Sequence, residues 1–323
     1  EIEIGGQLID RQYGDWMNIW TELTTPAGKR AGYDNMVGNN NPSGASQLGG
    51  RSLTAATRLY VPLQFWFNRN PGLALPLIAL QYHEVKLNLD LRASAELCNA
   101  TTTPTVPSLT LCKLYVDYIY LDTDERRRFA QVSHEYLIEQ VQFTGAESIT
   151  AASTTKNVTL NFNHPVKELV WAHTRTAYAA SGASASKWFN YSGSTGSVDS
   201  FTTALLQLNG HDRFSVRSAD YFRKVQNYEH HCRVPRVTGD LDTPDSRQQF
   251  IYTYSFALSP EEHQPSGTCN FSRIDNAVLQ LNYGIDSGTG AAALADGMNL
   301  NVYAVNYNVL RIMSGMGGLA YSN

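Results

Sequence analysis

The chain is 323 residues long and carries 25 basic and 29 acidic side chains, which gives a formal net charge of −4 at pH 7. This balance excludes direct binding of DNA or RNA, because neutralising phosphates requires an excess of basic residues on one surface. Only 17% of the residues are charged, against roughly 25% in an average globular chain, and such a surface suits burial against partners.

The first predicted elements are a short apolar strand, residues 1–4, and a glycine-centred turn that is followed by the pair Asp10–Arg11. The same order recurs about two hundred residues later, where the strand at 204–208 enters a turn followed by Asp212–Arg213. The repeat is far longer than the 20–50 residues of a solenoid or propeller unit, so we interpret it as two tandem domains of one fold. We expect each Asp–Arg pair to fasten its turn to the sheet within its own domain, with an interface ion pair as the alternative.

A helix is predicted over residues 11–22, where large apolar residues recur at helical spacing. Three predicted strands follow in the first half, at 59–67, 84–91 and 113–122, and each has a counterpart in the second half. A second short helix is predicted at 124–131, with Thr123 or Asp124 as its N-cap.

This second helix falls between the two copies, so it marks the predicted domain boundary. The first domain then covers residues 1–128 and the second residues 129–323, which agrees with the two domains expected from the length. We interpret the run Arg126–Arg128 inside this helix as a solvated or interdomain charge cluster.

The second half contains about eight predicted strands with alternating faces and no helix long enough to connect parallel strands. They begin near residues 136, 157, 167, 204, 250, 271, 276 and 301. The predicted fold class is therefore all-β, with each domain an eight-stranded sandwich or jelly roll.

The two copies differ in what precedes the glycine turn. About 70 residues, from 133 to 208, precede it in the second half, but only residues 1–4 do so in the first. We therefore expect the first sandwich to be incomplete at its N-terminus, with unpaired strand edges and an uncovered apolar face.

Long connections rich in glycine and serine are predicted at 38–50, 178–200 and 284–297, and loops of this length commonly form contact surfaces. Trp188, Phe189 and Tyr191 lie in one of them. These aromatic residues motivate the alternative function, a carbohydrate-binding or carbohydrate-cleaving β-sandwich protein.

The sequence predicts no catalytic residue, no metal site and no cofactor. Glu229, His230, His231 and Cys232 are adjacent, but neighbouring histidines rarely converge on a metal without further spaced ligands. The chain has no GxSxG or HExxH motif. The cysteines are too few and too scattered for a disulfide scaffold, so we expect free thiols at Cys98, Cys112, Cys232 and Cys269.

Four N-x-S/T sequons occur, at Asn99, Asn157, Asn190 and Asn270. Asn157 and Asn270 adjoin predicted strands, where a glycan would clash. Asn190 and Asn99 lie in predicted loops and are the candidate glycosylation sites, with Asn190 favoured by its position in a long loop.

Five blocks of the sequence carry a resemblance to a known family: LALPLIALQYHEVKL, DERRRFAQ, HEYLIEQVQFTG, QPSGTCNFSRIDNA and NYNVLRIMSGMGGLAYSN. With them the chain resembles the major capsid proteins of nucleocytoplasmic large DNA viruses, and it is most similar to those of the phycodnaviruses that infect algae. The similarity spans essentially the whole chain. Family members carry about three further strands before the strand that opens this chain.

The resemblance implies a double jelly roll and a structural, non-enzymatic role. Three copies would form a homotrimeric capsomer of pseudo-hexagonal outline, which contacts neighbouring capsomers and minor capsid proteins in an icosahedral shell over an internal viral membrane. Such a protein is located in the virion capsid and assembles in the host cytoplasm. No apolar run reaches the ~18 residues of a membrane span, so we expect no spanning segment.

Overall fold

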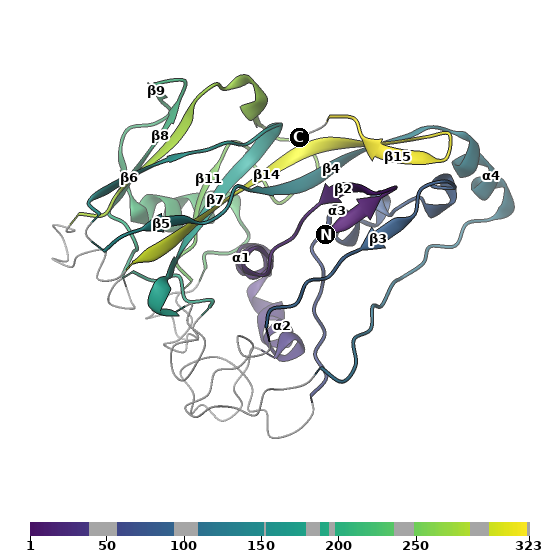
Figure 1. Cartoon of the computed structure of the whole chain (residues 1–323), viewed down its shortest axis with the longest axis horizontal. Helices are drawn as coiled ribbons and strands as arrows, with labels where there is room; N and C mark the ends of the chain where they lie inside the picture. The colour runs from purple at the N-terminus through teal and green to yellow at the C-terminus, as the bar shows by residue number, and fades with distance from the viewer. Residues whose placement is uncertain are drawn as a thin grey trace.

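The computed structural model describes residues 1–38, 57–93, 109–151, 153–178, 188–193, 198–235, 249–284 and 297–321. Within them the strands form three antiparallel sheets, one in the first half and two in the second (Figure 1).

The first sheet is built on a tight hairpin. Strand β1 (Ile2–Ile4) pairs with β2 (Gln7–Asp10), and Ile4 lies opposite Gln7. The two turn residues, Gly5 and Gly6, have φ values of 59° and 81°, the left-handed conformations that a two-residue hairpin turn requires. Strand β3 (Val85–Leu87) pairs with the other edge of β1.

The second half repeats this arrangement. Strand β8 (Thr203–Leu208) pairs with β9 (His211–Asp212) across Asn209 and Gly210, whose φ values are 52° and 78°. Strand β13 (Ala277–Asn282) pairs with the other edge of β8, as β3 does with β1. The predicted duplication is confirmed for this three-stranded unit.

In the second half, two sheets face each other across a core of buried aliphatic and aromatic side chains that includes Trp171, Leu206 and Leu279. The smaller sheet has the order β10-β8-β13-β6, with β9 on β8, and adds β10 (Arg217–Ser218) and β6 (Thr155–Thr159). The larger has the order β11-β7-β14-β15, with β12 on β7 and with β4 and β5 on β14. Its strands are β4 (His134–Phe143), β5 (Glu147–Ile149), β7 (Pro165–Arg175), β11 (Tyr252–Ser255), β12 (Cys269–Asn270), β14 (Met298–Met313) and β15 (Met316–Leu319). Seven of the eight strands predicted for this half are present. At the eighth, near residue 271, the two-residue strand β12 ends at Asn270 and a 3-10 helix begins at Phe271.

Strands β4 and β14 belong to both halves of the molecule. They pair over ten residues, from Tyr303 opposite Phe143 to Ile312 opposite His134. The Met298 end of β14 packs in the large core, whereas Leu310 and Ile312 pack in a second core. That second core also contains Ile2, Ile4, Ile9, Phe65, Trp66, Ala79, Leu80 and Ile138.

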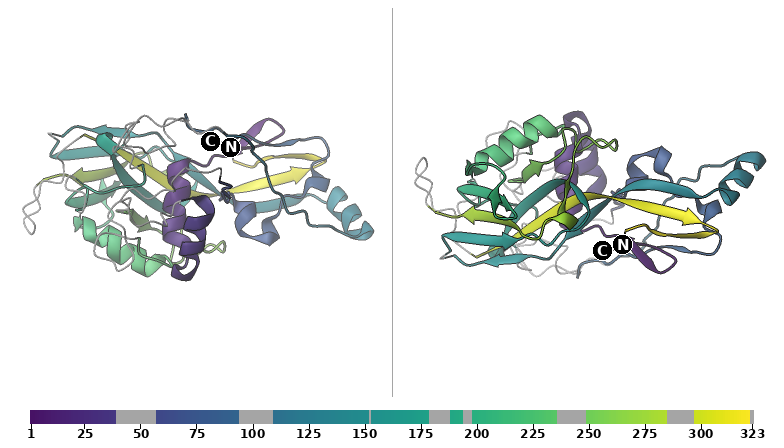
Figure 2. Two further views of the ribbon diagram at one scale, coloured as in Figure 1. Left: turned by 90° about the horizontal axis from the view of Figure 1, so that it is seen from below. Right: turned by 90° about the horizontal axis from the view of Figure 1, so that it is seen from above.

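Helix α1 (Gly14–Thr24) confirms the helix predicted over residues 11–22, shifted by a few residues. Its buried residues Trp16, Ile19, Trp20 and Leu23 pack into the core of the second half rather than that of the first. Figure 2 shows α1 beside the helical segment formed by η6 and α5. The two halves are therefore interlocked, since each contributes secondary structure to the core of the other.

Helix α4 (Thr123–Gln131) is capped by Asp122 instead of the predicted Thr123 or Asp124. The Asp122 carboxylate accepts from Glu125 N at 2.8 Å, and the Glu125 side chain accepts from Asp122 N, which completes a capping box. The remaining helical segments are η1 (Ala27–Lys29), α2 (Arg30–Val37), α3 (Trp66–Arg69), η2 (Pro71–Leu73), η3 (Leu77–Ala79), η5 (Thr176–Tyr178), the π-helix η6 (Tyr221–Val225), α5 (Gln226–His230) and η7 (Phe271–Arg273).

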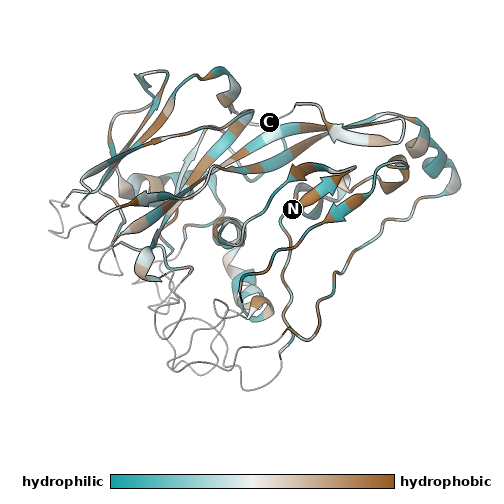
Figure 3. Cartoon of the chain, viewed as in Figure 1, coloured by the Kyte–Doolittle hydropathy of each residue, from teal (hydrophilic) through white to brown (hydrophobic). Residues whose placement is uncertain are grey.

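Two of the strands predicted in the first half are wrong. Residues 59–67 form no ladder, and Trp66 begins α3. Residues 113–122 are extended but pair with no strand in the described part of the chain, and their apolar side chains are exposed, Tyr120 by 92%. Figure 3 shows hydrophobic residues along this extended segment, which leads into α4.

Gly317 in β15 allows close packing between the halves. A Cβ at this position would lie 2.7 Å from Leu80 Cδ2 and 3.1 Å from Ile4 Cγ2, both in the second core. We expect Gly317→Ala to lower the free energy of unfolding by ~1–2 kcal/mol, because a packed core cannot absorb the extra methyl group without strain. Urea denaturation measures this change.

Gly318→Ala is the matched control. Its added Cβ meets only the end of the flexible Gln7 side chain, so a change within about 0.5 kcal/mol is expected. Equal effects of the two substitutions would contradict the packing role of Gly317.

Candidate functional site

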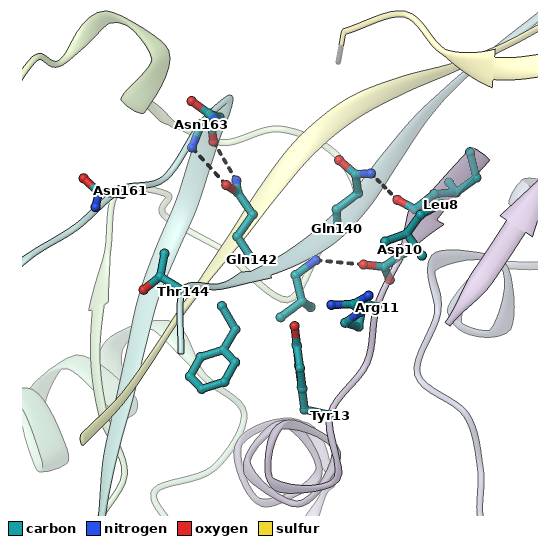
Figure 4. A pocket seen from close by; sticks show the side chains of 12 residues that line it. Leu8, Asp10, Arg11, Tyr13, Gln140, Gln142, Thr144, Asn161 and Asn163 are labelled. Carbon is teal, nitrogen blue, oxygen red and sulfur yellow. Dashed lines mark hydrogen bonds between the residues drawn. The ribbon is translucent and has the colours of Figure 1, made fainter. Parts of the chain in front are cut away.

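A polar groove of about 250 Å³ lies between β2 and β4, at the seam of the two halves (Figure 4). Most of the amide groups that line it are bonded to the protein itself. Gln142 Nε2 donates to Asn163 O at 2.7 Å, Asn163 N donates to Gln142 Oε1 at 2.9 Å, and Gln140 Nε2 donates to Ile9 O. The bond from Gln140 to Ile9 joins the two halves, whereas the Gln142–Asn163 pair lies within the second half.

Asp10 is the carboxylate that fastens β2 to the second half. Its Oδ1 accepts from Val141 N of β4 at 3.1 Å, and its Oδ2 accepts from Gln12 Nε2 at 2.8 Å. Burial raises the pKa of Asp10 from 3.8 to about 6. The prediction that the Asp10–Arg11 pair fastens its turn within the first domain is wrong, because Asp10 bonds to β4 of the second half and Arg11 pairs with Glu1 at 2.5 Å.

A buried charged cluster lies behind this seam. Lys167 of β7, with no exposed side-chain surface, contacts Glu139 Oε1 of β4 at 2.7 Å. The other oxygen of Glu139 accepts from Arg69 of α3 at 2.9 Å, and the Arg69 guanidinium stacks 4.4 Å from the ring of Trp20. Glu139 therefore joins a helix of the first half to a strand of the second.

One buried arrangement resembles a catalytic dyad. Ser200 Oγ lies 2.7 Å from His173 Nδ1, and His173 Nε2 lies 2.9 Å from Tyr283 OH. Both Ser200 and His173 are fully buried in the core, and burial lowers the pKa of His173 from 6.5 to about 3. A neutral histidine without access to a substrate is part of a core hydrogen-bond chain, not an active site.

The adjacent residues 229–232 do not form a metal site. His230 Nδ1 contacts Leu258 O at 3.0 Å, whereas the His231 ring lies between the Glu168 and Glu261 carboxylates. Across the described residues, no group of three or more His, Cys, Asp or Glu side chains has the geometry to hold a metal.

The candidate glycosylation sites fall in different parts of the chain. Asn99 lies outside the described residues. Asn190 is 3% exposed, and its Oδ1 accepts from both Ser192 N and Ser192 Oγ. Attachment of a glycan at Asn190 therefore requires movement of this segment, and glycosylation there stays a prediction.

The aromatic loop that motivated a carbohydrate-binding function is tied down within the protein. Tyr191 is fully buried and its hydroxyl accepts from Asn18 of α1. Trp188 stacks against Arg92 at 4.4 Å, and Phe189 O accepts from Gln249. The expected display of these rings to a ligand is wrong for Tyr191, because that ring fills the core.

Other apolar side chains form the exposed surface available for association. The described residues include 25 exposed large hydrophobic side chains, and 16 of these lie in the first 122 residues. On the second half, Val225, Tyr228 and Leu258 are exposed, Tyr228 by 80%. A surface of this kind is typical of proteins that associate with partners. Sequence patterning missed its location, since it reports alternation but not which strands lack a neighbour.

Comparison with known proteins decides which family this fold belongs to. The family model described as large eukaryotic DNA virus major capsid protein matches residues 125–318, and the model of the major capsid protein N-terminus matches residues 1–122. The chain belongs to the major capsid proteins of large eukaryotic DNA viruses. The resemblance seen in the sequence is confirmed.

The major capsid protein of Pyramimonas orientalis virus is 51% identical, over 100% of this chain and 76% of the relative. That of Paramecium bursaria Chlorella virus 1 is 44% identical, over 100% of this chain and 78% of the relative. A quasi-atomic model of the PBCV-1 virus capsid contains a chain that matches with a TM-score of 0.72 and 41% identity, over 100% of this chain and 83% of that one.

These matches confirm the predicted fold class and place the capsid protein in the virion. The fold is a double jelly roll, and the protein is a structural component of a viral shell that assembles with other capsid subunits. Among the described residues, no helix has the length and apolar composition needed to cross a bilayer.

Loss of the Glu139 charge is expected to destabilise the capsid protein strongly. Glu139→Gln removes the carboxylate shared by the buried Lys167 and the partly buried Arg69, so we expect the free energy of unfolding to fall by ~3–5 kcal/mol, measured by chemical denaturation. Glu135→Gln on the same strand is the control. Glu135 pairs with Arg311 at 2.8 Å on the exposed surface, where a loss of only ~0–1 kcal/mol is expected. A small effect at both positions would show that the buried pairs do not hold the seam.

Because its pKa is raised, Asp10 makes the stability of the folded state decrease with rising pH, which is the opposite of ordinary acid denaturation. Its folded pKa, about 6, lies above the unfolded value of 3.8, so the folded state binds more protons and its stability falls as pH rises between these values. Asp10→Asn should remove this dependence and raise stability at pH 7 by up to ~3 kcal/mol, since each pKa unit corresponds to about 1.4 kcal/mol. Denaturation at pH 5 and pH 7.5 measures both effects. A destabilised Asp10→Asn protein at pH 7.5 would contradict the effect of burial on Asp10.

Proposed function

We propose that this capsid protein forms a homotrimeric capsomer of pseudo-hexagonal outline that tiles an icosahedral shell. Two similar jelly rolls in each chain give six in a trimer, so a threefold ring presents six nearly equivalent edges to its neighbours. Two findings support this proposal. The chain belongs to the capsid protein family, and its fold matches a chain of the PBCV-1 capsid.

The observation that carries the proposal is the interlocking of the two halves. The β4–β14 ladder, helix α1 and the Glu139 cluster each span both cores, so the two rolls form one unit. A rigid pair of rolls is what pseudo-sixfold packing requires, because a hinge between them would blur the hexagonal outline.

The exposed aromatic side chains suit the contacts between subunits. Tyrosine gives a large contact area with few rotatable bonds and a polar hydroxyl, and the chain has 18 tyrosines. Tyr228 and Tyr120 are among the most exposed. We propose that surfaces of this kind contact adjacent chains, neighbouring capsomers and minor capsid proteins.

The domain division and the remaining partners are part of the same proposal. The domains meet within α4, between residues 128 and 129. This helix connects a segment of the first half to β4. An internal viral membrane lies beneath the shell, assembly takes place in the host cytoplasm, and glycans are attached at Asn190 or Asn99.

Multi-angle light scattering on the purified chain at micromolar concentration tests the proposal. We expect a mass of about three times the 35.8 kDa of one chain, and particles of hexagonal outline in negative-stain images. A monomer over the whole concentration range would contradict a trimer. A monomer that also binds a specific sugar on a glycan array would favour the carbohydrate-binding alternative.

A further inference from the structure

Two residues that follow α5 fasten helix α1 to the second half. Arg233 Nε donates to Glu22 O at 2.9 Å, and its guanidinium also pairs with the Glu22 carboxylate. Cys232 Sγ donates to Leu23 O at 3.4 Å. With His231, they form a strap, residues 231–233, that lies across the C-terminal end of α1.

His231 holds the strap on its other side. Its Nε2 lies 3.0 Å from Glu168 Oε2 of β7, and its Nδ1 lies 3.0 Å from Glu261 Oε1. The side chains of His231 and Glu168 have no exposed surface. Imidazole carries a proton on both nitrogens only when it is charged, so the two facing carboxylates favour the imidazolium form.

The neutral ring would leave Glu168 in an unfavourable position. Both carboxylate oxygens of Glu168 are buried without a hydrogen-bond donor in the described part of the chain, and the 3.0 Å contact with His231 is an ion pair whose N–H is not aimed at the oxygen. A buried carboxylate that loses its counter-charge is strongly destabilising. Deprotonation of His231 would also place a ring lone pair against one of the two carboxylates.

The other charged groups around His231 are already engaged elsewhere. On β7, Lys167 faces Glu139, and in the loop that carries Glu261, the Glu262 carbonyl accepts from Lys167 and His263 faces Glu139. On α1, Glu22 pairs with Arg233 and Arg30. On α5, His230 contacts a backbone carbonyl and Glu229 is exposed. Arg69 adds a favourable charge near Glu168.

We propose that His231 is a pH-operated latch: its imidazolium holds the strap 231–233, and with it α1, against the second half, and its deprotonation in alkaline solution releases both. The latch does not depend on the proposed trimer. Burial alone lowers the pKa of His231, but the Glu168 and Glu261 carboxylates outweigh burial and raise it from 6.5 to about 9. The stabilisation is therefore complete below pH 6.5 and is lost as pH rises through about 9.

Histidine-selective NMR on the full chain is the direct test. Spectra of the wild type, His231→Gln and His230→Gln assign the two neighbouring rings, and the His231 resonance is expected to titrate near pH 9. A titration near 6.5 in the folded protein would overturn the latch.

Thermal unfolding followed from pH 7 to pH 10 tests the energetic consequence. The melting temperature should fall as pH rises from about 6.5 to about 9 in the wild type and equally in His230→Gln, the matched control, but His231→Gln should be less stable throughout and lack this fall. Glu261→Gln keeps the buried pair with Glu168, so it should fold and show the fall at a lower pH. An unchanged fall in His231→Gln or in Glu261→Gln would contradict the proposal.

Hydrogen exchange at pH 7 tests the coupling to α1. Loss of the latch in His231→Gln should accelerate exchange in peptides covering 14–24 and 231–235 by about tenfold or more relative to His230→Gln, because the local opening becomes easier. If His231→Gln does not fold, the exchange rates of Glu261→Gln are compared with those of the wild type, both measured at pH 9. Faster exchange confined to the strap would overturn the coupling to α1.

Discussion

The antiparallel pairing of β4 with β14 is the constraint on which the rest of the structure depends. The ten paired residues run from the large core, where Val141 and Tyr303 are buried, to the second core, where Ile138 and Leu310 are buried. A slip by one residue would turn every side chain of the ladder to the opposite face in both cores at once. The register of this one strand pair therefore fixes how the two rolls lie with respect to each other.

Polar groups at the seam add specificity to this pairing. Asp10, Glu139 and Lys167 are buried, and charged pairs in such positions contribute less net stability than well-packed apolar residues because both partners lose hydration. These buried groups are, however, satisfied by only one arrangement of hydrogen-bond and charge partners. Arg69 must reach Glu139 while it stacks on Trp20, which holds α3, β4 and α1 in one geometry. For a subunit whose function is to fit a lattice, a single geometry matters more than additional stability.

The sequence alone predicted the second jelly roll well and the first one poorly. The alternation of apolar and polar residues correctly predicted β13 and β14, because both strands have neighbours and bury one face. Leu279 and Leu281 of β13 are buried in this way. The same alternation in residues 113–122 predicted a strand, but a ladder needs partners, and that segment has none within the described residues. Periodicity is a local property, whereas pairing is set by what lies alongside.

The contacts across the seam were beyond sequence reasoning for a similar reason. The Asp10–Arg11 pair was expected to fasten its turn within the first domain, but Asp10 bonds to Val141, 131 positions away along the chain. His231 and Glu168 are likewise distant in sequence, and nothing in the local pattern of residues 229–232 indicates that His231 meets buried carboxylates while His230 meets a backbone carbonyl. Family resemblance supplied the fold and the capsid role, since its motifs cover both halves.

The position of β14 in the sequence has a consequence for biosynthesis. Residues Met298–Met313 are synthesised after every strand that they pair with except β15, yet they form the centre of the larger sheet and complete the core of the first half. Multidomain chains usually fold from the N-terminus during synthesis. Here neither roll can close before β14 has left the ribosome, so the strands made earlier must wait with their apolar faces open, and both rolls then fold together.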